Sequence, residues 1–129
     1  MLVARFYELR LLSYLGYQPQ LFHCVVSDDE IQDEDQYFSA ELGGIIAPGY
    51  EMHDFKARPI SASAVKLLRF LQTRKWSEVQ AVHLKRKLHT ELETIMSHYI
   101  SHTLERNLES LELLMRLRDE ARTLSLKGE

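Results

Sequence analysis

Two histidines, His98 and His102, stand four residues apart, the spacing at which a helix brings two imidazole rings to one face and can hold a metal ion. The zinc-protease pattern also needs a glutamate directly after the first histidine, and Tyr99 stands there instead. A pair of packing or surface histidines is therefore the favoured interpretation, and metal binding is the alternative.

Cys24 is the only cysteine, so the chain can form no internal disulfide. His23 beside it and His53 further on would complete a mixed ligand set only if the fold brought them together. The sequence contains no glycine-rich phosphate loop and no Gly-x-Ser-x-Gly elbow, and no general base stands at a recognisable spacing from Cys24. We therefore expect no catalytic site, no bound metal and no cofactor.

Charge is strongly segregated along the chain. Residues 55–90 carry nine Lys or Arg against Glu78 alone, although the net charge of the whole chain is -3. A basic stretch in an acidic protein is a candidate contact for phosphate or for an acidic peptide, and solvated helix faces are the simpler explanation. The nucleic-acid candidates are Lys66, Arg69, Arg74, Lys75, Lys85, Arg86 and Lys87. Six acidic residues between Asp28 and Asp35 lack the spacing of a calcium loop and predict an exposed loop.

The elements that must position these groups are predicted to be mainly helical. The chain has 129 residues, 45% hydrophobic and 27% charged, which is the size and composition of one globular domain. Apolar residues recur at helical spacing over residues 2–15, and Gly16 is placed as a C-terminal stop. Arg5, Glu8 and Arg10 interrupt this segment, which excludes a membrane span and disfavours a secretory signal.

Three further helical segments follow later in the chain. Ser61 can cap a helix that runs to about Thr73, and a short helical turn is expected within 76–84. From Leu84 onward, apolar residues at steps of three and four predict a long helix to about Leu104. Helical spacing then continues toward the end of the chain, and the pattern allows a break or kink around Asn107.

The segment between the first two helices has the pattern of a small β-hairpin. Two short runs, 37–42 and 45–47, flank a Gly-Gly turn at 43–44. Pro59 marks a further break before the next helix. We therefore expect a mainly α fold, a helical bundle in which residues 17–59 form an irregular, hairpin-centred insert.

Blocks of residues spread over most of positions 5–111 stand in a distinctive order. They are Tyr7-Glu-Leu-Arg-Leu-Leu, Leu15-Gly-Tyr-Gln-Pro19, Phe38-Ser-Ala-Glu-Leu-Gly-Gly44, the stretch from Ile60 to Leu71, and a closing Tyr99, Leu104, Arg106, Leu108 and Ser110. Each block alone is weak, but the ordered combination resembles the C-terminal half of the recombination mediator RecO. The resemblance implies one helical C-terminal domain over residues 1–129, without the family's oligonucleotide-binding (OB) barrel, which we would expect to precede Arg5.

The sequence departs from the family at a zinc site. Many members hold zinc with two Cys-x-x-Cys pairs in the insert, and this chain has Cys24, Ser27, Ala47 and Tyr50 at the four positions. The resemblance therefore implies a degenerate zinc-ribbon-like hairpin that has lost its metal ligands and is held by packing.

The resemblance further implies a non-enzymatic role in recombinational DNA repair, in DNA annealing and in loading of the strand-exchange protein, in the cytoplasm at the nucleoid. The partners implied are the acidic, apolar-ended tail of single-strand binding protein, another recombination mediator and, weakly through phosphate contacts, DNA. The partner-binding residues implied on the first helix are Arg5, Phe6, Tyr7 and Arg10. A peptide of this kind needs an apolar pocket and cations for its carboxylates.

Two other classes of function stay open on the sequence. The first is a helical nucleic-acid-binding regulator or adaptor that uses residues 55–90, and its mark would be a helix-turn-helix unit within 61–90 that projects its arginines outward together. The second is an enzyme or metal protein built on the histidines, which metal analysis of the purified protein would test.

Overall fold

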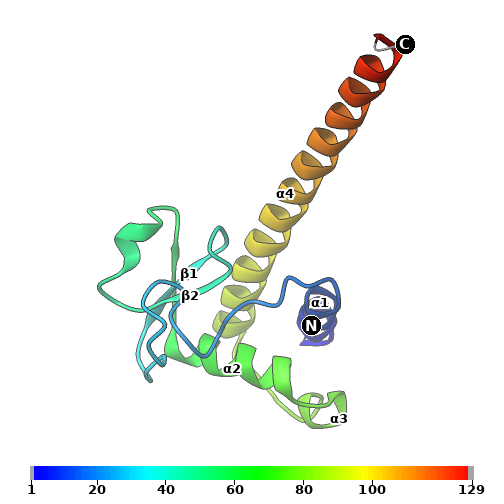
Figure 1. Cartoon of the computed structure of the whole chain (residues 1–129). Helices are drawn as coiled ribbons and strands as arrows, with labels where there is room; N and C mark the ends of the chain where they lie inside the picture. Colours follow the sequence, from blue (N-terminus) through cyan, green and yellow to red (C-terminus); the bar gives the residue numbers. More distant parts are fainter. Residues whose placement is uncertain (1, 128–129) are drawn as a thin grey trace.

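The computed structural model describes residues 2–127 and shows a mainly helical chain with one small sheet (Figure 1). The elements are α1 (Leu2–Tyr14), β1 (Gln36–Ser39), β2 (Gly44–Ile46), η1 (Glu51–His53), β3 (Arg58–Ile60), α2 (Ala62–Thr73), α3 (Trp76–Val79) and α4 (Arg86–Lys127). The expected fold class, mainly α with a small β insert, is confirmed. The described helices include none that is long and apolar enough to cross a membrane.

Helix α1 ends at the glycine that the sequence predicts. Gly16 has a φ of +88°, a left-handed conformation that glycine adopts without steric cost. The Gly16 amide donates to the Ser13 carbonyl at 3.1 Å and the Tyr17 amide to the Leu12 carbonyl at 2.7 Å. This pair of bonds is the Schellman arrangement, which satisfies the last carbonyls of the helix and turns the chain toward the insert.

Helix α2 begins at a cap built from three separate segments. The Ser61 hydroxyl accepts the Ala64 amide at 3.1 Å, as the sequence predicts. Asp35, from the acidic loop, accepts the Ala62 amide at 3.0 Å. Glu91 of α4 accepts the Ser61 amide at 2.8 Å and the Ser61 hydroxyl at 2.7 Å. The first turn of α2 therefore ties the insert and α4 together.

The insert contains the expected hairpin and one strand that the sequence did not indicate. Strand β1 pairs antiparallel with β2, with Ser39 opposite Gly44, and the strand order is β2-β1-β3. Pro59, expected only as a break, lies inside the edge strand β3 opposite Tyr37. An edge strand tolerates proline because its outer side needs no amide donor. A Cβ at Gly44 would lie 2.4 Å from the Gln20 carbonyl oxygen, so the close approach of residue 20 requires glycine there.

Helix α4 differs from the expectation in its length. It begins at Arg86 rather than Leu84 and runs unbroken for 42 residues, so the break considered at Asn107 does not occur. Asparagine is only a weak helix former and does not remove a backbone donor, so tertiary contacts can hold it in a helix. Here the Tyr17 hydroxyl hydrogen-bonds to the Asn107 side chain.

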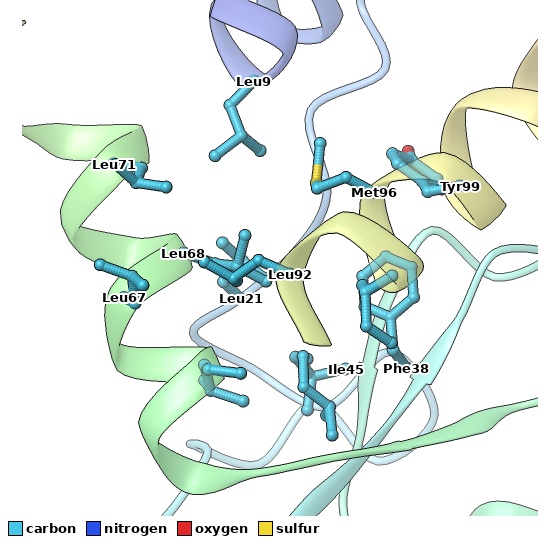
Figure 2. Close-up of a cluster of buried hydrophobic side chains, with 14 of the residues drawn as sticks. Leu9, Leu21, Phe38, Ile45, Leu67, Leu68, Leu71, Leu92, Met96 and Tyr99 are labelled. Carbon is cyan, nitrogen blue, oxygen red and sulfur yellow. The ribbon is translucent and has the colours of Figure 1, made fainter. Parts of the chain in front are cut away.

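The core lies where α1, α2 and the first half of α4 meet one face of the sheet (Figure 2). Leu9 of α1, Leu68 and Leu71 of α2 and Leu92 of α4 are at most 1% exposed. Tyr99 packs edge-on against Phe38 of β1, with ring centroids 5.4 Å apart, and donates its hydroxyl to the Tyr17 carbonyl at 2.7 Å. Burial raises the pKa of the Tyr99 phenol, with a smaller opposing effect of the Thr103 hydrogen bond.

Candidate partner-binding groove and basic surface

The four partner-binding residues implied on α1 do not share one surface. Successive residues of a helix are about 100° apart, so Arg5 and Tyr7 lie on opposite flanks of Phe6. Phe6 itself is buried, at 7% exposed. Arg5 forms an ion pair with Glu8, and its side chain is only 17% exposed. Tyr7, at 59% exposed, faces solvent on the other flank.

Arg10 is occupied by the end of α2. Its guanidinium donates to the carbonyl oxygens of Leu71 and Arg74, at the C-terminus of that helix, where a cation also meets the negative end of the helix dipole. The same guanidinium lies 4.8 Å from the centroid of the Phe6 ring, a cation–π distance. Arg10 thus holds α1 against α2.

An aromatic stack links α1 to the short helix α3. The Trp76 ring lies 5.4 Å from the Phe6 ring and 6.5 Å from the Tyr7 ring, centroid to centroid. Beside this stack is a groove of about 410 Å³ between the start of α1 and the chain that joins α3 to α4. Its lining is Leu2, Val3, Trp76, Gln80, Val82, His83, Leu84 and His89. The groove can therefore accept an apolar side chain beside the imidazole rings of His83 and His89.

The seven nucleic-acid candidates of the segment 55–90 fall into two groups. Lys66 pairs with Asp33 at 3.0 Å, and Arg69 donates to the Leu21 carbonyl at 2.7 Å while its guanidinium lies 5.0 Å from the Phe22 ring centroid. The guanidinium of Arg74 lies 5.9 Å from the Phe70 ring centroid. These three side chains are engaged by neighbouring parts of the fold.

The second group lies beside the groove residues in the sequence, and Lys85 and Lys87 line a neighbouring pocket that shares His83 and Leu84 with the groove. Lys75 directly precedes Trp76, and Lys85, Arg86 and Lys87 directly follow Leu84 at the start of α4. All four are exposed, and none forms an ion pair within residues 2–127. The positive end of the α4 dipole adds to the charge of the last three. The structure thus gathers free cations near a groove whose lining is partly apolar and partly polar.

The feature expected of a DNA-reading regulator is not present in residues 61–90. Helix α3 has four residues, a single turn, which is too short for a recognition helix that reads base edges from a groove. Arg69 points back to the insert instead of outward.

The four family zinc positions lie close together but do not fit a zinc ion. The amides of Ser27 and Ala47 point at the Cys24 sulfur, at 3.5 and 3.3 Å. Burial alone would raise the pKa of the Cys24 thiol, but these bonds outweigh it and lower the pKa below its ordinary value. Ser27, Ala47 and Tyr50 supply none of the thiolate or imidazole ligands that tetrahedral zinc requires. The loops are therefore held by N–H···S bonds and packing.

One histidine of the pair, His102, takes part in a contact between α4 and the turn after β1. His102 Nε2 lies 3.0 Å from Glu41 Oε2, and Arg106 donates to Glu41 Oε1 at 3.0 Å. Partial burial lowers the pKa of His98, and nearby Arg58 and His102 lower it further, against a smaller effect of Asp54. Within residues 2–127, no group of three or more His, Cys, Asp or Glu side chains is arranged to hold a metal ion.

Sequence reasoning did not identify the groove. Its lining comes from the start of α1 and from the segment 76–89, for which the sequence predicted only a short turn and the beginning of a long helix. The sequence feature that could have pointed to the groove is Trp76, the single tryptophan, which directly follows Lys75 in a connecting segment.

Comparison with known proteins confirms the resemblance found in the sequence. The family model "Recombination protein O C terminal" matches residues 1–112. The DNA repair protein RecO of a Roseiflexus species is 36% identical over 124 residues, which are 96% of this chain and 44% of that protein. Those of Desulforamulus reducens and Dehalococcoides mccartyi are 29% and 31% identical, and the matches cover 90% and 91% of this chain. The chain therefore spans somewhat less than half the length of these relatives.

Proposed function

The chain belongs to the family of the C-terminal part of recombination protein O, and from this premise we propose that it acts in recombinational DNA repair as a non-enzymatic binding unit. Its role would be to receive partner proteins and to assist DNA annealing and loading of the strand-exchange protein. The observation that carries the proposal is the partly apolar groove beside α1, with four free cations near it, two of which line the adjoining pocket.

The partner we propose for the groove is the acidic, apolar-ended tail of single-strand binding protein. Val3 and Trp76 offer apolar contact to the last side chain of such a tail. The exposed Lys75 and the Lys85–Lys87 cluster can meet its carboxylates. Charge steers the approach of the peptide, and burial of its last ring supplies most of the affinity.

Fluorescence titration of a labelled tail peptide tests this assignment. Charge reversal of Lys85 and Lys87 to glutamate should weaken binding about tenfold at low salt, and removal of the last apolar residue of the peptide should cost at least as much. Lys66→Glu is the matched control, because Lys66 is already paired with Asp33 away from the groove lining. Absence of saturable binding, or equal losses in control and groove variants, would contradict the assignment.

Substitution of Arg5 tests whether the tail peptide binds instead to the flank of α1 that carries this residue. Arg5 must release Glu8 before it can bind a peptide carboxylate. A loss of about tenfold in Arg5→Ala would place the tail on that flank, since a bidentate Arg–carboxylate contact is worth about 1 to 3 kcal/mol. Unchanged affinity in Arg5→Ala, with loss in the lysine variants, supports the groove.

We propose weak binding of single-stranded DNA by the same free cations. Each phosphate contact to a single strand contributes a slope of about -0.7 in a plot of log affinity against log salt. Reversal of Lys85, Arg86 and Lys87 should reduce that slope by about two units, and reversal of Lys66 and Arg69 should change it far less. Tight binding that is insensitive to salt would exclude this mode.

A further inference from the structure

The C-terminal half of α4 carries a broad apolar face that no other element of residues 2–127 covers. We call residues 104–127 the distal segment, and Figure 1 shows it extending away from the sheet and the other helices. Eight apolar side chains of this segment are between 50% and 69% exposed: Leu104, Leu108, Leu111, Leu113, Leu114, Met115, Leu117 and Leu124.

The apolar face is too wide for a helix that stays in water. At about 100° per residue, Glu105, Glu109, Glu112 and Arg116 all fall within an arc of about 60°. The eight apolar side chains are spread over the remaining circumference, and Arg106, Arg118 and Arg122 lie among them. A helix with such a wide apolar face is normally covered by other protein.

Only part of the exposed apolar face can meet one partner helix. Five of the side chains lie within about 80° of the direction of Leu114, namely Leu104, Leu111, Leu114, Leu117 and Leu124. Together they expose less than the roughly 800 Å² that each partner contributes to a standard interface, so the face fits a weak dimer.

The apolar positions are also symmetric along the helix. Leu111 and Leu117 are each three residues from Leu114, and Leu113 and Met115 are each one residue away. Leu104 and Leu124 are likewise equidistant from it, at ten residues. Leu108 is the exception, because its counterpart is Glu120.

We propose that the distal segments of two copies of this chain pair antiparallel about a two-fold axis at Leu114. The pairing places leucines opposite apolar residues of the partner, as a self-complementary interface requires. The distal segment is about 36 Å long, so antiparallel pairing also keeps the folded remainders of the two copies at opposite ends.

Sedimentation velocity of the full chain over a concentration series tests the proposal. The chain should form a dimer that dissociates in the micromolar range. Leu114→Glu should weaken the dimer by about 100-fold or more, because a two-fold interface contains each substitution twice. Thr123→Glu introduces the same residue on the charged arc and should leave the dimer unchanged. Circular dichroism of both variants confirms that the helix is retained.

A spin label on Thr123→Cys tests the orientation. Cys24 is buried, so the introduced thiol is the one that reacts. Thr123 lies on the outer face of each helix, so parallel pairing separates the two labels by about 20 Å across the helix pair, whereas antiparallel pairing about Leu114 adds about 27 Å along the axis and separates them by about 34 Å. A monomer at every concentration, a dimer that Leu114→Glu leaves intact, or labels at the shorter separation would each overturn the proposal.

Discussion

Replacement of Glu91 should destabilise the protein more than its surface position implies. Glu91 lies on α4 and accepts two hydrogen bonds from Ser61, the residue that caps α2. These two bonds join α4 to the start of α2. Glu91→Ala removes both of them, and it also removes a negative charge from the positive end of the α2 dipole.

The expected magnitude follows from these contacts. A hydrogen bond to a charged group contributes about 1.5 to 3 kcal/mol, with the smaller value suited to a partly exposed pair. The Ser61 hydroxyl still accepts the Ala64 amide, so the cap is weakened and not lost. We therefore expect a loss of about 2 to 3 kcal/mol, which in a chain of this size lowers Tm by about 8 to 12 °C. Glu91→Gln keeps one acceptor oxygen and should lose about half as much.

Urea unfolding followed by circular dichroism measures the effect. Glu93→Ala is the matched control, because Glu93 is exposed on the same helix and forms no ion pair within residues 2–127. The control should stay within about 0.5 kcal/mol of the wild type. Equal stability of Glu91→Ala and Glu93→Ala would refute the assignment of Glu91 as the joint cap of α2.

Three further predictions concern the insert and its contact with α4. Elemental analysis should find no stoichiometric zinc and chelator should leave Tm unchanged, because three of the four family ligand positions hold Ser, Ala and Tyr. His98 has a pKa below its ordinary 6.5, so the unfolded chain binds its proton at higher pH than the folded chain. Stability should therefore be full above about pH 6.5 and fall on acidification, and His98→Gln should flatten that fall in urea titrations. Gly44→Ala should cost at least about 2 kcal/mol through its clash with the Gln20 backbone, whereas Gly49→Ala should cost only the strain of a positive φ, about 1 kcal/mol.

The features predicted correctly from sequence were those set by local chemistry. Gly16 marks the end of α1 because only its backbone conformation is needed there. Ser61 marks the start of α2 because a hydroxyl three residues before a free amide can cap it. Of the predicted Gly-Gly turn, Gly43 lies between β1 and β2 as expected, whereas Gly44 is already the first residue of β2 and pairs with Ser39.

The features that were missed depend on contacts between distant segments. Strand β3 is three residues long and contains Pro59, and it exists because β1 offers a free edge beside it. Helix α4 passes Asn107 without a break, and its side chain contacts Tyr17, 90 residues away in sequence. The groove beside Trp76 joins the first residues of the chain to residues 76–89, so no local pattern could have shown it.

The basic segment 55–90 shows what a count of charges in the sequence predicts and what it misses. By sequence, all seven candidate cations were equivalent, because they share one segment with a single acidic residue. In the fold, Lys66 pairs with Asp33 of the acidic loop, and Arg69 donates to the Leu21 carbonyl in the insert. The cations left free are those around α3 and the start of α4, beside the groove. A peptide and a DNA strand would therefore compete for the same cations, and only the peptide would also gain from the apolar lining.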